Sequence, residues 1–461
     1  MKRGTEKFRQ ILLVLLLAIV AAGIPDAGRA ATADAGLVLE AVHVLDRDYV
    51  DQPLVERVRL LNFALDGMRQ ALSRAGIVAE LTQIPKETQA AEANRIFRER
   101  FDTALASGQG RIPAQELVYA AIRAMTAALN DSHTGFLTPA QYRERLARQS
   151  GRAGYTGVGM AILPKDGRFY VWVVIPRSPA EARGVQRFDR IVRVNDIATG
   201  GMTHEQMVSM IRGPAGTSVT VTLERPGRSG TFAITITRAP IPLPSVLVAR
   251  ILEPGVGYIH IYQFGDRTAR EMRDALRSLL GQGMRALILD LRGNSGGFLH
   301  ELRAVLNLML PPGLPAYQEA SSQGTQIVTT LGVPLLSSRI PLVVLVDEGT
   351  ASAAELLAAA VAEHNRGTLV GIKTAGAVEA SILFALSDGS ALSVTIRRMS
   401  TGKGKRLEGV GVVPDAAVDL STEDFARGRD AQLSRAILIA RQRLARTATA
   451  PTPSLLMATH R

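Results

Sequence analysis

The stretch Pro341–His364, PLVVLVDEGTASAAELLAAAVAEH, constrains the fold more than any other part of the chain. Leu342–Val346 is an apolar run of strand length, and residues 347–351 are small or polar. From Ala353 onward the pattern is rich in Ala and Leu and predicts a helix. Ser352 therefore falls where a buried strand gives way to a helix, beside free backbone N–H groups and the positive end of the helix dipole. A serine there is either an N-cap or a nucleophile whose oxyanion those groups stabilise.

The composition describes an ordinary globular protein and excludes several classes of function. A chain of 461 residues is long enough for two or three domains. The formal net charge is +12, but the arginines are scattered and form no dense run with aromatic residues, which argues against a nucleic-acid partner. The absence of cysteine excludes thiol catalysis, disulfides and cysteine-ligated zinc. No spacing of His, Asp and Glu suggests a metal site, so we expect neither metal nor cofactor.

The first residues have the layout of a secretory signal peptide. A basic start is followed by the apolar run Ile11–Ile24 and by AGRAATADA, with cleavage plausible after Ala30 or Ala33. The run is shorter than the roughly 20 residues that a membrane span needs. We expect residues 1–30 to be removed during export to the periplasm or cell envelope. An uncleaved membrane anchor is the alternative interpretation.

Changes in pattern divide the remaining chain, and the fold class predicted is α/β multidomain. Residues 31–150 read as helices, 151–240 as a compact β-rich module after a linker at Gly151–Gly154, and 241–425 as an α/β core. Residues 426–461 contain the end of a terminal helix over Asp424–Ala445 and a disordered tail. Hairpin-like strands at Ser381–Leu386 and Ala391–Ile396 are expected to complete the core.

Four further positions carry modest signals when each is taken alone. Gly296 and Gly297 follow a buried strand, and they form either a tight turn or a place where a backbone N–H is exposed as an oxyanion donor. His133, beside Ser132, is either a loop histidine with satisfied hydrogen bonds or a general base. Glu408 is either a solvated charge or the group that orients an imidazole.

The joint order of these segments resembles a known family. LILDLRGNSGG, VVLVDEGTASAAELLAAAV, LVGIKTAG and EGVGVVPD follow one another as in the carboxy-terminal processing proteases and tricorn-like serine peptidases. The β-rich module, with GVGM followed by SPAEARGVQRFDRIVRVND, resembles a PDZ domain, and DSHTGFL precedes it as the corresponding loop does in the family. The resemblance implies a PDZ domain joined to a crotonase-like serine protease core.

By this resemblance Ser352 is the nucleophile of a serine endopeptidase. The N–H of Ala353, with that of Gly296 or Gly297, would form the oxyanion hole. The PDZ domain would take the free C-terminus of a protein or peptide substrate on the backbone N–H groups of Gly157, Val158, Gly159 and Met160. Phe188 stands where such PDZ domains usually have glycine. By analogy with the family, the N-terminal helices would mediate self-association.

One departure from the family concerns the proton acceptor. The processing proteases use a Ser–Lys dyad, but Ala377 occupies the lysine position and Ser381 the position of a following glutamine. One explanation is a tricorn-like site in which His133 is the base, supported by Ser132 and Glu408. A neutral imidazole can accept the serine proton near neutral pH without the desolvation that a lysine needs. The other explanation is a pseudoprotease that acts as a PDZ tail-binding adaptor. A crotonase-like acyl-transfer enzyme is disfavoured, because a PDZ domain and an export signal have no role in it.

Overall fold

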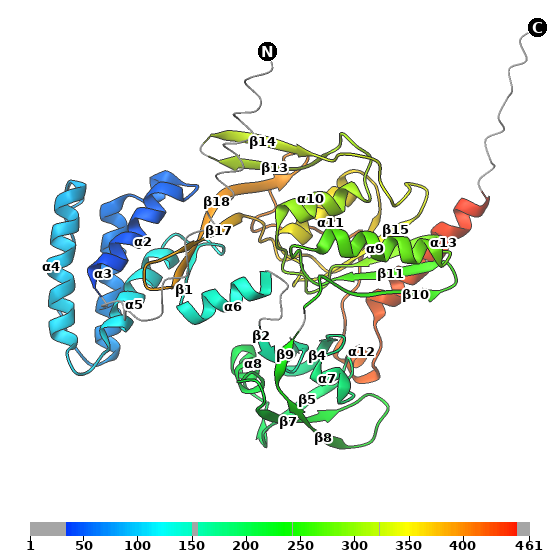
Figure 1. The fold of residues 1–461 in the computed structure, drawn as a ribbon, viewed down its shortest axis with the longest axis horizontal. Helices are drawn as coiled ribbons and strands as arrows, with labels where there is room; N and C mark the ends of the chain where they lie inside the picture. Colours follow the sequence, from blue (N-terminus) through cyan, green and yellow to red (C-terminus); the bar gives the residue numbers. More distant parts are fainter. Residues whose placement is uncertain (1–33, 150–154, 242, 322, 450–461) are drawn as a thin grey trace, which may run out of the picture. The chain divides into compact units, whose positions relative to one another are not determined.

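The computed structural model describes residues 34–149, 155–241, 243–321 and 323–449, drawn in colour in Figure 1. Two compact units are present: residues 1–142 with 383–394, and residues 143–382 with 395–461. The expected signal peptide, the linker at residues 151–154 and the tail from residue 450 lie outside the described residues. Within the described ranges, no helix combines the length and apolar character that a bilayer crossing requires.

The first unit is helical, as the three- and four-residue spacing of its apolar side chains predicts. Each of its longer helices buries one apolar face, and α3 and α5 make the most extensive contacts in the unit. The elements are α2 (Ala35–Asp48), η1 (Gln52–Leu54), α3 (Arg57–Arg74), α4 (Ala90–Gly108), α5 (Ala114–Ala127) and β1 (Gly135–Leu137). Helix α6 (Pro139–Gln149) follows at the boundary between the units.

The β-rich module of the second unit is an antiparallel sheet in the order β3-β4-β5-β7-β8, with β6 paired to β5. Apolar residues from the sheet and from α8 form its core, among them Val171, Met207 and Val221. A separate ribbon pairs β2 with β9. The bounds are β2 (Tyr155–Gly157), β3 (Met160–Lys165), β4 (Arg168–Val174), α7 (Pro179–Ala182), β5 (Arg190–Val194), β6 (Ile197–Ala198), α8 (His204–Ile211), β7 (Ser218–Glu224), β8 (Thr231–Thr237) and β9 (Ala239–Ile241).

A six-stranded sheet in the order β10-β11-β12-β15-β16-β19 carries the core of the second unit. The strands from β11 to β19 are parallel, and β10 runs antiparallel at the edge. The elements are β10 (Val246–Glu253), β11 (Val256–Ile261), α9 (Thr268–Gly281), β12 (Ala286–Asp290), α10 (Leu299–Asn307), β15 (Leu342–Val346), α11 (Ala353–Glu363), β16 (Thr368–Gly371) and β19 (Ala416–Ala417).

Both faces of this sheet are covered, which explains why β12 and β15 are apolar throughout. Alternate residues such as Leu289 and Val344 pack with α9, α10 and α11. The intervening residues, such as Ile288 and Val343, pack against α13 (Ala431–Thr449). Because parallel strands end at the same edge, the loops after β12 and β15 meet there.

Three features differ from the sequence expectations. The strands β17 (Ala380–Ala385) and β18 (Ala391–Thr401) pair with each other outside the six-stranded sheet. The later part of β18 pairs with β13 (Pro315–Ser321), which in turn pairs with β14 (Gly324–Thr329). Neither β13 nor β14 was expected from the sequence. The expected terminal helix is two helices, α12 (Thr422–Arg427) and α13, because Gly428 adopts a left-handed conformation (φ 64°) and ends the first.

Candidate active site

Ser352 lies at the turn between β15 and α11, as the sequence predicts. Its backbone has φ 55° and ψ −123°, a conformation that favours glycine. Residues other than glycine persist in such conformations only where the surrounding structure imposes them, and these positions cluster at active sites. A serine at a strained strand-to-helix turn presents its hydroxyl at the end of the sheet, as the nucleophile of α/β-hydrolases does. The side chain of Ser352 is half-buried.

The turn before Ser352 is clamped to the loop that follows β12. The Asp347 carboxylate accepts hydrogen bonds from the N–H groups of Gly293 (2.8 Å) and Gly349 (3.0 Å). The Thr350 hydroxyl donates to the carbonyl of Leu291 (2.9 Å). Burial of Asp347 raises the pKa of its carboxyl to about 6. The clamp therefore fixes both loops, although the carboxylate at its centre is costly to keep charged.

The glycines after β12 are required by their closeness to Ser352. A Cβ on Gly296 would lie 2.6 Å from Ser352 Cβ and 2.9 Å from the backbone nitrogen of Ala353. The N–H of Gly296 donates to Asn294 Oδ1 (2.8 Å), so this group is already engaged. Among the described residues, the N–H groups of Gly297 and Ala353 meet no hydrogen-bond acceptor. The free N–H of Ala353 lies at the positive end of the α11 dipole, and that of Gly297 follows the glycine packed against Ser352.

The segment that contains Ala377 lies directly against the serine. The Ser352 N–H donates to the carbonyl of Ala377 (2.7 Å). Glu355, which is fully buried in the first turn of α11, accepts from the N–H groups of Gly376 (2.7 Å) and Ala377 (2.9 Å) and from the Thr374 hydroxyl (2.5 Å). A methyl group thus stands at the position where the resemblance leads one to expect a lysine.

Glu408 lies beside the same segment. Its Oε2 accepts hydrogen bonds from the N–H groups of Val378 (2.7 Å) and Glu379 (3.3 Å). Glu379 accepts in turn from the N–H of Met399 (2.8 Å), and burial raises the pKa of its carboxyl to about 7. Glu408 therefore fixes the backbone just past Ala377, a role that its sequence context does not indicate.

His133 and Ser132 belong to the first unit, in the loop between α5 and β1. The loop is shaped by Asp131, whose carboxylate accepts from the His133 N–H (2.9 Å) and from the Thr134 hydroxyl (2.7 Å). Ser352, Gly296, Gly297, Ala353 and Glu408 all lie in the second unit. The structure places Gly296 against Ser352 and Ala353 and binds Glu408 to the backbone just past Ala377, whereas a meeting of His133 with Ser352 stays a prediction.

Comparison with known proteins shows which family the chain belongs to. The sequence model of peptidase family S41 matches residues 255–418, and that of the PDZ domain matches residues 145–224. A carboxyl-terminal-processing protease of Synechocystis is 34% identical over 316 residues, 68% of this chain and 73% of the relative. The processing protease CtpA of Bacillus subtilis is 32% identical over 312 residues, 68% of this chain and 66% of that protein. The chain belongs to peptidase family S41.

Solved structures agree with that assignment of this S41 chain. The photosystem II D1 C-terminal processing protease is 29% identical, with a TM-score of 0.52 over 84% of this chain and 93% of that one. An S41 protease structure from Bacteroides fragilis shares the fold at 16% identity, with a TM-score of 0.55 over 89% of this chain and 98% of that one. The S41 peptidase is thus a serine-type peptidase that carries a PDZ domain, and its β-rich module is that domain.

A cavity of about 560 Å³ runs along the PDZ domain of the S41 peptidase. On one side it is lined by β3 and by the loop Gly157–Met160, and on the other by Val208 and Ile211 of α8. Gly159 (φ 83°) lies so close to Ser178 that a Cβ would come within 2.1 Å of the serine Cβ. Ser295 and residues 347–349 of the protease core line the same cavity. The cavity between β3 and α8 of the PDZ domain is therefore continuous with the loops that flank Ser352.

Two site residues were missed from the sequence alone. Glu355 was not expected from the sequence to act at the site, yet it holds the segment that contains Ala377. Asn294 binds the carbonyl of Ile261 (2.9 Å) and the N–H of Gly296 (2.8 Å), and so positions the glycines. Both roles could have been inferred from position. A buried amide just after a strand, or a buried carboxylate in the first turn of a helix, needs hydrogen-bond partners and so indicates contacts with neighbouring loops.

Proposed function

We propose that this S41 peptidase is an endopeptidase that cleaves protein substrates through an acyl-enzyme at Ser352. The Ser352 hydroxyl attacks the scissile carbonyl, and the N–H groups of Ala353 and Gly297 stabilise the tetrahedral oxyanion. The cavity that joins the PDZ groove to the loops beside Ser352 carries the proposal, because a chain bound in the groove is led toward the serine. Gly297 is preferred over Gly296 as the donor because the Gly296 N–H is bound to Asn294.

We propose His133 as the base that takes the Ser352 proton, with Ser132 and Glu408 in support. The methyl group of Ala377 offers no proton acceptor, although the carbonyl of Ala377 binds the Ser352 N–H (2.7 Å). A base must then come from another segment, and an imidazole titrates in the required range. Glu408 would stabilise the imidazolium electrostatically while it holds the backbone N–H groups of Val378 and Glu379.

The PDZ domain is proposed to select substrates by their free C-termini. An extended tail would add as a strand beside β3, with its carboxylate on the N–H groups of the loop Gly157–Met160 and its side chains toward α8. We further propose that the chain is exported after removal of residues 1–30, and that its N-terminal helices mediate self-association. Sequencing the N-terminus of the exported protein tests the first point, since cleavage is expected after Ala30 or Ala33.

Fluorophosphonate labelling combined with casein cleavage tests the chemistry. The variants S352A, H133A and E408Q are each compared with the unmodified chain. We expect S352A to lose labelling and cleavage, H133A to lose at least about a thousandfold in cleavage rate, and E408Q to lose about tenfold or more. Full activity of H133A contradicts the assignment of the base. Absence of both labelling and cleavage in the unmodified chain points instead to a tail-binding adaptor.

A second experiment separates a wrong base from a misfolded variant. Ala377→Lys is introduced into H133A, so that an amine extends from the position beside Ser352. If the serine and its oxyanion donors are otherwise complete, the double variant recovers part of the cleavage rate that H133A lost. Ala377→Met is the matched control, since its side chain is long but offers no basic amine. Equal rates for the lysine and methionine variants contradict the proposed placement of Ala377.

A further inference from the structure

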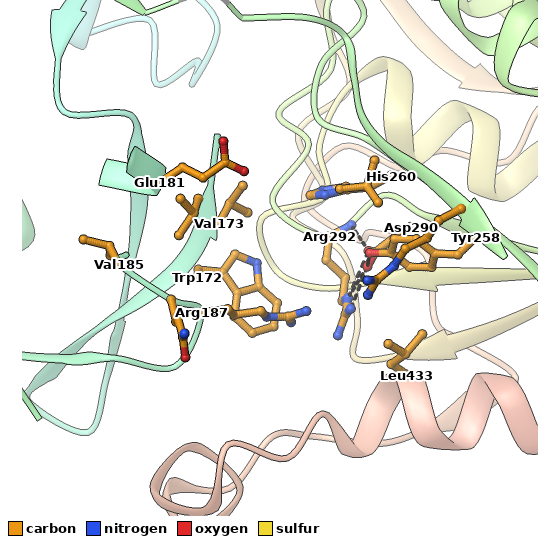
Figure 2. A pocket seen from close by; sticks show the side chains of 14 residues that line it. Trp172, Val173, Glu181, Val185, Arg187, Tyr258, His260, Asp290, Arg292 and Leu433 are labelled. Atoms are coloured by element: carbon orange, nitrogen blue, oxygen red, sulfur yellow. Dashed lines mark hydrogen bonds and ion pairs between the residues drawn. The ribbon is translucent and has the colours of Figure 1, made fainter. Parts of the chain in front are cut away.

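A second cavity, of about 360 Å³, lies between the PDZ domain and the protease core within the second unit (Figure 2). Trp172 of β4 and Arg187 of the loop after α7 line it from the PDZ side. His260 of β11 and Arg292 after β12 line it from the core side. Its lining shares only Trp172 with the peptide groove, so it is a separate site.

The charge of Arg187, which lines the cavity, is only partly compensated. Its guanidinium stacks on the ring of Trp172, 3.8 Å from the centroid. Its Nη2 lies 3.0 Å from Asp430 Oδ2, but Arg292 already holds both oxygens of that carboxylate at 2.9 Å. Asp290 is likewise bound by Arg292. Two arginines therefore share the carboxylate of Asp430.

Two nitrogens of the Arg187 guanidinium lack a well-placed hydrogen-bond acceptor. Among the described residues, its Nε and Nη2 make no hydrogen bond of good geometry, although Nη2 is ion-paired with Asp430. These two nitrogens form one edge of the guanidinium, which matches the two oxygens of a carboxylate. A ligand carboxylate at this edge would replace Asp430 there, and Asp430 would keep both of its bonds to Arg292. Burial and the positive charge of Arg292 both lower the pKa of Arg187, so an added negative charge would stabilise its charged form.

His260 supplies a second polar group without a partner. The residue is only 6% exposed, and its Nε2 has no hydrogen-bond partner among the described residues. In Figure 2 its ring points from the core toward the side of the cavity that carries Trp172 and Val173. Buried polar atoms are normally hydrogen-bonded, and an exception asks for an explanation such as an absent ligand.

We propose that this cavity binds a carboxylate attached to a small apolar group. The carboxylate would pair with the Nε–Nη2 edge of Arg187, with His260 as a second partner. The apolar group would pack between Val173 and Val248 and against Leu433, which give the cavity hydrophobic walls. Such walls disfavour a fully polar anion such as phosphate. The ligand would bridge the PDZ domain and the core, and its binding does not depend on the reaction proposed at Ser352.

Trp172 makes a direct test possible, because it is the only tryptophan of the 461 residues. Its fluorescence in the full chain is titrated with 4-methylpentanoate, which joins an isobutyl group to a carboxylate, and with the neutral 4-methylpentanamide. We expect a saturable change with the acid only. Arg187→Gln should weaken binding at least about tenfold, and Arg187→Lys should weaken it as well, because lysine lacks the two-nitrogen edge. Arg183→Gln, at an exposed position nearby, is the matched control.

Peptide C-termini carry the same chemistry as free acids, so a second arm uses a pentapeptide that ends in leucine. Both ligands are titrated against Val208→Arg, which obstructs the peptide groove but leaves this cavity open. A signal from the acid alone identifies a small free acid as the ligand, whereas a peptide signal that survives Val208→Arg identifies a C-terminus. No response to the acid, or a response that Arg187→Gln leaves unchanged, overturns the proposal.

Discussion

Ser352 is held in a backbone conformation that is strained for a serine but not for a glycine. Its φ of 55° lies in the region that favours glycine. Both Ser352→Ala and Ser352→Gly remove the hydroxyl, but only glycine relieves the strain. We expect the unfolding free energy of the glycine variant to exceed that of the alanine variant by about 1 kcal/mol, measured by urea denaturation. At Ser278, in the exposed face of α9, the order should reverse by a similar amount, because glycine weakens a helix.

Protonation of Asp347 should make the unfolding free energy of the protein depend on pH. Burial raises the pKa of its carboxyl from 3.8 to about 6, so the folded state binds the proton more tightly than the unfolded state. Its contribution is therefore greatest below the unfolded pKa and is lost as pH rises through the folded pKa. The two backbone N–H groups that donate to Asp347 both meet Oδ1, and an asparagine also offers such an oxygen.

Asp347→Asn should accordingly stabilise the protein at pH 8 by about 1 to 3 kcal/mol. The difference from the unmodified chain should shrink to less than about 1 kcal/mol at pH 4, where Asp347 itself is largely protonated. Urea unfolding at the two pH values measures both numbers. Glu80→Gln is the control, since Glu80 is exposed and is not among the charges that act on Asp347, so it should show no such trend. A gain for Asp347→Asn that is equal at both pH values contradicts this account.

Among the elements, the short helix α12 joins the PDZ domain to the core. Phe425 of α12 is fully buried, with its ring 4.5 Å from that of Tyr170 and 5.6 Å from that of Phe188. Phe188 adopts φ 71°, a conformation that favours glycine, and packing of its ring against Phe425 and Trp172 compensates for the strain. The phenylalanine at this PDZ turn therefore serves the attachment of the domain.

Phe425→Ala should lower the unfolding free energy by about 3 to 5 kcal/mol, because it removes a large buried ring and leaves a cavity. It should also shift the fluorescence of Trp172 toward that of an exposed indole, since the two rings lie 6.2 Å apart. Leu438→Ala, at a side chain that is 43% exposed, should cost less than about 1 kcal/mol. An unchanged Trp172 spectrum in Phe425→Ala contradicts the proposed attachment.

Long elements with a clear period were predictable from the sequence, whereas contacts between distant segments were not. The run Leu342–Val346 and the helix after Ser352 were expected, and the structure confirms them. Strand β14 was missed because its residues are mostly exposed and show no apolar alternation. The hairpin of β17 and β18 was assigned to the core because local pattern does not specify the partner of a strand. The four hydrogen bonds that Glu355 accepts were hidden for the same reason.

At the scale of the whole molecule, the helical unit includes a piece of chain from far downstream. Residues 383–394 belong to it, and Phe136 of β1 pairs with Leu392 of β18. Tyr119 donates to Asp388 (2.8 Å), and Glu40 accepts from the N–H of Ser387 (3.1 Å). The unit therefore cannot be removed by truncation from the N-terminus without exposing a strand edge.

A chain that lacks residues 31–142 should accordingly aggregate, because an unpaired edge strand is a template for association. Size-exclusion chromatography and thermal unfolding measure this against the chain that lacks only residues 1–30. Supplying residues 31–142 as a separate polypeptide during expression should restore part of the soluble fraction. A truncated chain that stays monomeric and melts cooperatively contradicts this view of the unit.

The division of one unit between two stretches of sequence also limits how such a protein can evolve. A recombination event with a relative at a single point near residue 143 would exchange the helices but leave the downstream segment 383–394 behind. The new helices would then meet a foreign strand and foreign partners for Ser387 and Asp388. The two stretches are therefore expected to be inherited together, and substitutions in one should be accompanied by substitutions in the other.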